Sequence, residues 1–227
     1  MEDHKNRILK DYDKQLLIYF SINLVIFICI FINKNITIKD LNQTYSNITL
    51  DGGMIAGGSI VVFILKGVLS ANIKASLVFW RIKDPLPGCR IFTELGKKDY
   101  RIDFKVLESK YGTLPTEPKE QNKLWYKFLV QYRDDDMIFK SHRDYLYSRD
   151  LTGLAFLFFI FYSLAAIVVG KNIKVVEIYI FILFVVYVII SIVGRIYGNR
   201  FACNVLAKEY SSIKMDYSKI QKPIPHN

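Results

Sequence analysis

The stretch LTGLAFLFFIFYSLAAIVV, residues 151–169, decides the class of this protein, because it is long, apolar and free of charge. An α-helix rises about 1.5 Å per residue, so a bilayer core of about 30 Å needs ~20 such residues. Residues 16–32 and 175–193 have the same character, and Glu177 is the only charged residue in those two runs. We therefore expect each of the three stretches to cross a membrane as a helix.

A fourth segment, residues 53–74, has a run of 12 uncharged, mainly apolar residues at 54–65 before Lys66. It reaches the length of a span only if a charged residue enters the bilayer. Charged side chains in membrane helices usually face a bundle interior or a water-filled cavity. Spacing at 3.6 residues per turn places four polar residues on one stripe of this helix. The pattern predicts a pore-lining stripe made of Ser59, Lys66, Ser70 and Lys74.

The Lys and Arg residues are concentrated in three segments. Residues 1–14 hold four, residues 82–150 hold 14 and residues 195–227 hold six, whereas the loops 33–52 and 170–174 hold two each. The excess of Lys and Arg in cytoplasmic loops predicts that both termini and the central loop are cytoplasmic. The expected fold is an all-α membrane protein with four transmembrane helices, N-in and C-in, and a helical cytoplasmic domain between spans two and three.

The expected organisation has five parts. They are an N-terminal arm (1–14), a first transmembrane hairpin (15–81), the cytoplasmic helical domain (82–150), a second hairpin (151–194), and a helix extension with a tail (195–227). Within the domain, residues 98–111, 118–132 and 137–150 have the apolar spacing and the stop signals of helices.

The net charge of +10 gathers at the cytoplasmic ends of spans two and four. Such a cluster attracts anionic lipid headgroups, or it forms a site for a phosphorylated, nucleotide-like anion. The turn at residues 83–92, KDPLPGCRIF, is either a structural elbow or a loop that presents backbone N–H groups to an anion. The candidate ligand-binding residues are Arg90, Arg143, Arg149, Arg195 and Arg200.

Small residues in and beside the spans favour close helix packing and a homo-oligomer. The candidate packing positions are Gly53, Gly57, Gly67, Gly194 and Gly198.

Enzyme chemistry has no support in the sequence, which lacks a nucleophile elbow, a zinc-protease motif, a P-loop and a dinucleotide-binding glycine pattern. The three cysteines are far apart in sequence, and no metal-ligand spacing or cofactor motif is present. We expect no enzyme, no cofactor and no metal. A lipid-directed enzyme acting through Cys89 or His142 is the least favoured alternative.

The segments PLPGCRIF (85–92), LWYKF (124–128), HRDYLYSRD (142–150) and RFACNVLAKEY (200–210) resemble a group of small bacterial multi-pass membrane proteins, some encoded beside anti-phage defence genes. The resemblance covers residues 80–210. It implies a bacterial inner-membrane location and a role in opening pores or depolarising the membrane.

These observations lead to two hypotheses from different classes. The first is an oligomeric membrane channel or pore-forming effector whose cytoplasmic basic region senses an anionic ligand. The alternative is a non-conducting membrane scaffold that recruits a soluble partner protein through an exposed face of Leu124, Trp125 and Phe128.

Overall fold

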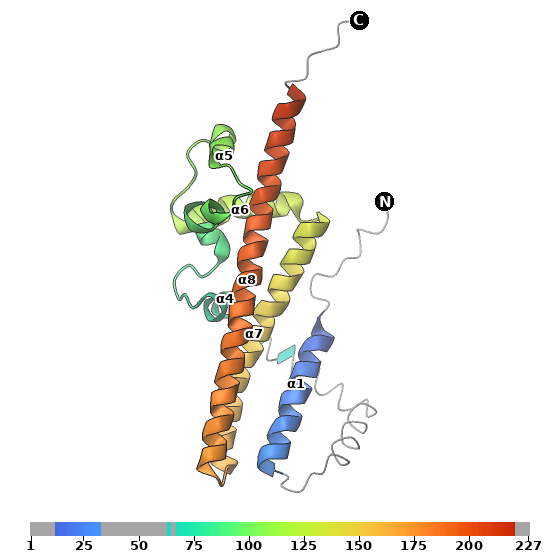
Figure 1. Cartoon of the computed structure of the whole chain (residues 1–227), viewed down its shortest axis with the longest axis vertical. Coiled ribbons are helices and arrows are strands. Elements are labelled where there is room, and N and C mark those ends of the chain that lie inside the picture. Colours follow the sequence, from blue (N-terminus) through green and yellow to red (C-terminus); the bar gives the residue numbers. More distant parts are fainter. Residues whose placement is uncertain (1–11, 33–62, 65–66, 221–227) are drawn as a thin grey trace, which may run out of the picture. The chain divides into compact units, whose positions relative to one another are not determined.

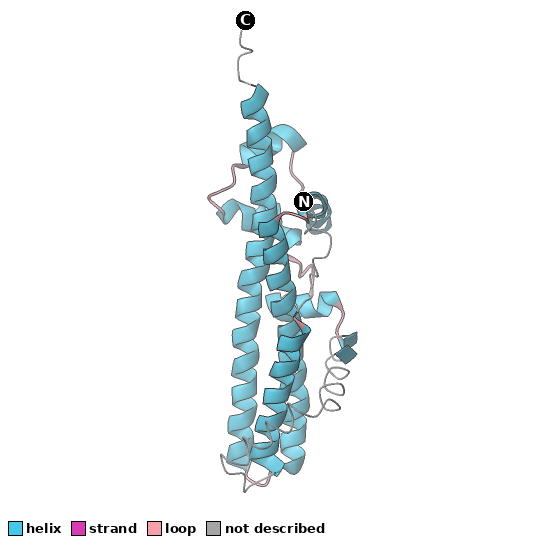
Figure 2. Cartoon of the chain, turned by 90° about the vertical axis from the view of Figure 1, so that its right-hand side faces the viewer, coloured by secondary structure: helices cyan, strands magenta, loops and turns pink. Residues whose placement is uncertain are grey.

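The computed structural model describes residues 12–32, 63–64 and 67–220, with side chains described up to Met215. These residues form helices joined by loops, with no strand among them (Figure 2). Three helices are long and apolar enough to cross a membrane: Asp13–Phe31, Asp136–Val169 and Ile173–Met215. The chain is therefore an all-helical protein with the helices of a multi-pass membrane protein. The four-span count and the N-in, C-in orientation stay predictions, since residues 53–62 and 65–66 of span two lie outside the described residues.

The long helices are labelled α1 (Asp13–Phe27), α7 (Asp136–Val169) and α8 (Ile173–Ile220) in Figure 1. A π-helical turn, Ile28–Ile32, continues α1. At 34 and 48 residues, α7 and α8 exceed the ~20 residues that a bilayer core requires. Asn172 caps α8, because its side-chain oxygen accepts hydrogen bonds from the backbone N–H groups of Lys174 at 3.1 Å and Val175 at 3.4 Å.

Contacts divide the chain into two compact units. One unit contains the most apolar segments: the described residues from Tyr12 to Val78, together with Tyr147–Ile192. Its core joins α1, α7 and α8 through a buried cluster of Phe27, Ala166, Val176, Tyr179 and Leu183. Large apolar side chains elsewhere on these helices are exposed, including Ile18, Val168 and Phe181. An apolar exterior around an apolar core is what a lipid environment requires.

The other unit contains Phe79–Leu146 and the described part of α8 from Val193 onward. It includes a 3₁₀ turn (Pro87–Arg90), α5 (Phe104–Tyr111) and α6 (Pro118–Tyr132). The apolar face of α6 is buried: Trp125 donates a hydrogen bond from Nε1 to the backbone oxygen of Ala202 at 3.1 Å and meets the Phe201 ring edge-on. This packing fixes α6 against α8.

A buried carboxylate joins three helices of the same unit. Glu209 of α8 is fully buried and accepts hydrogen bonds from Lys110 at 2.7 Å, from the Tyr111 hydroxyl at 2.6 Å and from the Tyr132 hydroxyl at 2.8 Å. Burial and the bond to Glu209 raise the pKa of Tyr132 to about 12, against the lowering effect of Ser212. Three donors satisfy the carboxylate, so α5, α6 and α8 are linked at one point.

The predicted helix over residues 98–111 begins later than expected. Asp103 caps α5, because its carboxylate accepts a hydrogen bond from the backbone N–H of Lys105 at 2.9 Å, and the helix starts at Phe104. Gly112, with φ at 73°, ends it. The second predicted helix, opened by Thr116 and Pro118, is α6, which runs Pro118–Tyr132. The predicted third helix, residues 137–150, is the first part of α7, where Asp135 provides the cap.

Candidate functional site: a basic pocket

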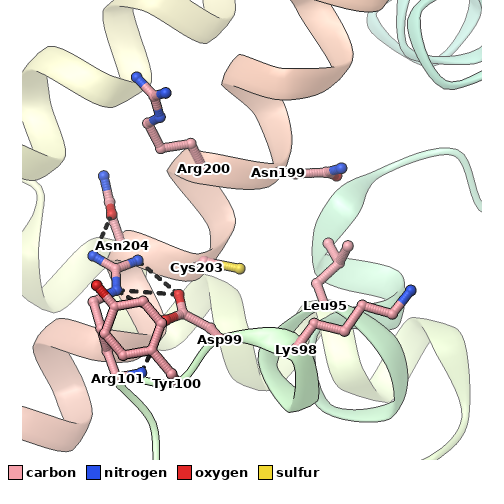
Figure 3. Close-up of a pocket in the computed structure, with 9 residues that line it drawn as sticks. All are labelled: Leu95, Lys98, Asp99, Tyr100, Arg101, Asn199, Arg200, Cys203 and Asn204. Atoms are coloured by element: carbon pink, nitrogen blue, oxygen red, sulfur yellow. Dashed lines mark hydrogen bonds and ion pairs between the residues drawn. The ribbon is translucent and has the colours of Figure 1, made fainter.

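A cavity of about 710 Å³ lies in the unit that contains α5 and α6, between the segment 95–101 and the α8 segment 199–204. Figure 3 shows the residues that line it: Leu95, Lys98, Asp99, Tyr100, Arg101, Asn199, Arg200, Cys203 and Asn204. The volume is in the range of small-molecule and cofactor pockets, about 300–1,000 Å³, but the depression is shallow and widely open to the surface.

Arg101 is held in one position by its neighbours. Its guanidinium binds both carboxylate oxygens of Asp99, the closest N–O distance being 2.7 Å, and donates a hydrogen bond to the side-chain oxygen of Asn204 at 3.0 Å. The hydrogen bonds from Arg101 lower the pKa of Asp99, and the reciprocal bond raises the pKa of Arg101. The pair is therefore ionised, and it anchors the loop after residue 98 to α8.

Two further cations, Lys98 and Arg200, lie at the cavity with exposed side chains, and neither is in an ion pair within the described part of the chain. Both extend away from the Arg101–Asp99 group in Figure 3. The three cations and the one carboxylate among the lining residues leave a net charge of +2. Tyr100 is 98% exposed beside them and offers an aromatic face. Lys98 and Arg200 extend in different directions in Figure 3, so each can contact a separate anionic group of a ligand, and Tyr100 can stack on an aromatic ring.

Of the five arginines predicted to bind a ligand, only Arg200 lines this cavity. Arg90 is buried: it lies 3.7 Å from Glu94, donates to the Asn199 side chain at 3.4 Å and has its guanidinium carbon 4.7 Å from the Phe79 ring centre. Burial, chiefly, lowers its pKa. Arg90 therefore packs inside the protein rather than facing a ligand.

The other three arginines are dispersed. Arg195 stacks on the Trp80 ring at 4.2 Å, and Arg143 lies 3.9 Å from Asp144. Arg149 belongs to the other unit, where it lies 3.2 Å from Asp150. Arg90 and Arg195 lie near each other on the neighbouring rings of Phe79 and Trp80, but only Arg200 lines the pocket, so the five predicted arginines do not all line this site.

The turn at residues 85–92 is a structural elbow. Its Gly88 packs so closely against α6 that an added Cβ would lie 2.9 Å from the Trp125 ring and 2.3 Å from Asn122. The backbone N–H of Cys89 donates to the Leu86 oxygen at 3.1 Å. The turn is buried and the Cys89 N–H is already used, which favours the structural elbow over the anion-binding alternative.

The predicted pore-lining stripe is described only in its last part. Ser59 and Lys66 lie outside the described residues. Residues 69 and 70 are not helical, and α4 starts at Ala71, with the Ser70 hydroxyl accepting a hydrogen bond from the Ile73 N–H at 3.3 Å. The expectation that Ser70 and Lys74 continue one unbroken helix is wrong, because Ser70 caps a new helix instead.

Lys74 forms a buried ion pair. Its Nζ lies 3.0 Å from Asp150, and the two side chains are 8% and 1% exposed. Asp150 also accepts a hydrogen bond from the Tyr12 hydroxyl at 2.8 Å and lies beside Arg149. Within one chain, Lys74 is therefore a neutralised internal charge rather than a residue facing water.

The predicted glycine positions have different surroundings. Gly198 faces Phe79 and Tyr145, whose ring atoms would lie within 3.0 Å of an added Cβ, and Gly194 is buried. Gly67 has open space around it, and Gly53 and Gly57 lie outside the described residues. Gly198 is thus required for contacts inside one chain.

Sequence reasoning missed most of the pocket. It assigned KDYR, residues 98–101, to a helix, whereas these residues end a 3₁₀ turn and form the loop that carries Lys98, Asp99 and Arg101. In the sequence, the density of charge and the tyrosine of this short run were the features that could have indicated the pocket.

Comparison of the chain with protein-family models, with curated proteins and with solved structures found no match, so the basic pocket and the long apolar helices are the basis for a function.

Proposed function

We propose that this protein is an oligomeric channel or pore-forming effector of the bacterial inner membrane, which responds to a small phosphorylated, nucleotide-like anion bound in the basic pocket. The observation that carries the proposal is the pocket itself, with its net charge of +2 and its two exposed cations. Phosphate groups bind well to Arg and Lys donors, and a base can stack on an exposed aromatic ring.

The coupling between ligand and membrane would run through α8. This single 48-residue helix contains Asn199, Arg200 and Asn204 of the pocket, and its N-terminal part is the apolar run 175–193. A ligand bound by these pocket residues therefore contacts the same helix that contains the apolar run. A pore lined by one helix per subunit needs several subunits around an axis, hence the oligomer.

The scaffold alternative requires an exposed face that includes Trp125 and Phe128. Trp125 and Phe128 are 6% and 2% exposed and belong to the core of their unit. A soluble partner cannot dock on side chains that are already covered. The resemblance to proteins encoded beside anti-phage genes agrees with an effector that damages the membrane, and such a role is part of the proposal.

The ligand half of the proposal is tested by calorimetric titration of the purified protein with ATP, AMP and inorganic phosphate. We expect ATP to bind, and we expect Lys98→Ala and Arg200→Ala each to weaken it about tenfold, since a charged hydrogen bond contributes about 1.5–3 kcal/mol. Both side chains are exposed, so stability should not change. Lys97→Ala is the matched control, because Lys97 is exposed and next in sequence but outside the cavity. Equal affinity in all variants contradicts the assignment.

The conduction half is tested by ion release from liposomes that contain the protein, with and without the nucleotide that binds. Wild-type protein should release ions when the ligand is present. Lys66→Glu should change the ion selectivity or abolish release, since it reverses a charge in the predicted path. Absence of release under every condition, with ligand binding intact, would remove the channel and leave a ligand-binding membrane protein.

A further inference from the structure

The loop that follows α4 presents apolar side chains to the outside. It runs from Trp80 to the 3₁₀ turn at Pro87 and belongs to the same unit as α6. Trp80 is 52% exposed and Ile82 is 97% exposed. Exposing Ile82 and half of Trp80 to water is unfavourable in free energy, so these side chains favour an apolar environment.

The backbone of this loop is held in an unusual conformation. Trp80 and Asp84 have φ values of 53° and 47°, the left-handed region that residues with a side chain rarely adopt. These two residues bracket the segment with Arg81, Ile82 and Lys83. The loop therefore has a left-handed residue at each end, and Ile82 lies in the middle of the segment between them.

Basic side chains surround the apolar ones. Arg81 and Lys83 flank Ile82, and Arg195 places its guanidinium carbon 4.2 Å from the Trp80 ring centre. Two carboxylates are nearby: Asp84 in the loop, and Glu94, which lies 3.5 Å from Arg81 and 3.7 Å from Arg90. With Arg90 included, four cations face two carboxylates, so the surroundings of the loop are positive.

The Trp80–Arg195 contact also relates the loop to the membrane boundary. Arg195 is the second residue after the apolar run 175–193, and Trp80 directly follows α4. Two chain segments that leave apolar helices at different points of the sequence thus meet at this cation–π contact. Tryptophan with nearby Arg and Lys is the composition typical of the membrane–water interface.

We propose that the loop of residues 80–84, here named the interfacial loop, is a membrane anchor for a leaflet that contains anionic lipid. Ile82 and the Trp80 ring enter the boundary between headgroups and acyl chains. Arg81 and Lys83 bind lipid phosphates. The site takes a phospholipid headgroup through its phosphate and its adjacent acyl chain, and it does not depend on channel activity or on the basic pocket.

The chain offers an internal control for the test, because it has two tryptophans. Trp125 is 6% exposed in the core of the unit, whereas Trp80 is half exposed in the interfacial loop. The experiment places the protein in phosphatidylcholine–phosphatidylglycerol liposomes that contain lipids brominated at a shallow or a deep acyl position, and it measures tryptophan quenching. The emission of Trp80 is obtained in Trp125→Phe, and also as the difference between wild type and Trp80→Phe, which keeps the test valid if the core variant does not fold.

We expect shallow bromine to remove most of the Trp80 emission, deep bromine to remove less, and neither to affect Trp125. Ile82→Glu should shift the Trp80 emission to the red and reduce its quenching. If Trp80 is quenched by aqueous iodide and not by brominated lipid, the loop is in water and the proposal is overturned. Shielding of Trp80 from both quenchers would mean that a second copy or another protein covers the loop, which also overturns it.

The headgroup contact is tested by native mass spectrometry of protein released from nanodiscs. Arg81→Ser with Lys83→Ser should retain fewer phosphatidylglycerol molecules than wild type, while retention of phosphatidylcholine stays the same. Lys119→Ser with Lys127→Ser is the matched control, since these exposed lysines of α6 lie outside the loop. Equal loss in both double variants would show a general charge effect and would overturn the specific contact.

Discussion

Asp150→Asn lowers the free energy of unfolding by about 3–5 kcal/mol, the cost of leaving buried charges without their partner. Asp150 lies 3.0 Å from the Nζ of Lys74, whose side chain is 8% exposed, and it also neutralises Arg149. Its second carboxylate oxygen accepts the Tyr12 hydroxyl. One substitution therefore weakens the links from α7 to α4 and to the residue that precedes α1.

The measurement is thermal or denaturant unfolding in detergent micelles. Asp144→Asn is the matched control on the same helix, because Asp144 is part-exposed and lies 3.9 Å from Arg143, so its loss should cost less than about 1 kcal/mol. The triple variant Lys74→Met, Arg149→Met and Asp150→Leu should recover most of the loss, since apolar residues then replace both cations together with their carboxylate. Equal effects of Asp150→Asn and Asp144→Asn would show that the pair is not buried in the folded protein.

Trp125→Ala lowers the free energy of unfolding by a similar amount, about 3–5 kcal/mol, the range for buried aromatic side chains replaced by alanine. The indole ring packs edge-on against Phe201 and contacts Gly88 closely, and its N–H binds the Ala202 oxygen. Truncation removes the hydrogen bond and leaves a cavity where α6, α8 and the 3₁₀ turn meet.

Tyr126→Ala is the control for that substitution. Tyr126 is the next residue of α6 and is exposed, so its removal should change stability by no more than about 0.5 kcal/mol. The pair of variants also separates the two hypotheses for α6. If Trp125→Ala leaves stability unchanged but abolishes capture of a protein partner, Trp125 is a docking residue, as the scaffold hypothesis requires. It is then not part of a buried core.

The features of this protein that depend on local chemistry could be predicted from the amino-acid sequence alone. Apolar runs of helix-spanning length, with Glu177 as their one charged residue, predicted the helices at residues 16–32, 151–169 and 175–193, because a bilayer tolerates no unsatisfied backbone and few charges. The boundaries of α6 followed from Pro118 and the apolar spacing after it. Such features need no knowledge of which segments meet.

Which charged residues form ion pairs with each other could be seen only in the tertiary structure. Lys74 and Asp150 are 76 positions apart, so no local pattern predicts their ion pair, and Lys74 was expected to face a pore. The pocket likewise joins Lys98 and Arg101 to Arg200 across about half of the chain. The physical reason is that the role of a charged residue depends on what desolvates and neutralises it, and packing between distant segments sets both.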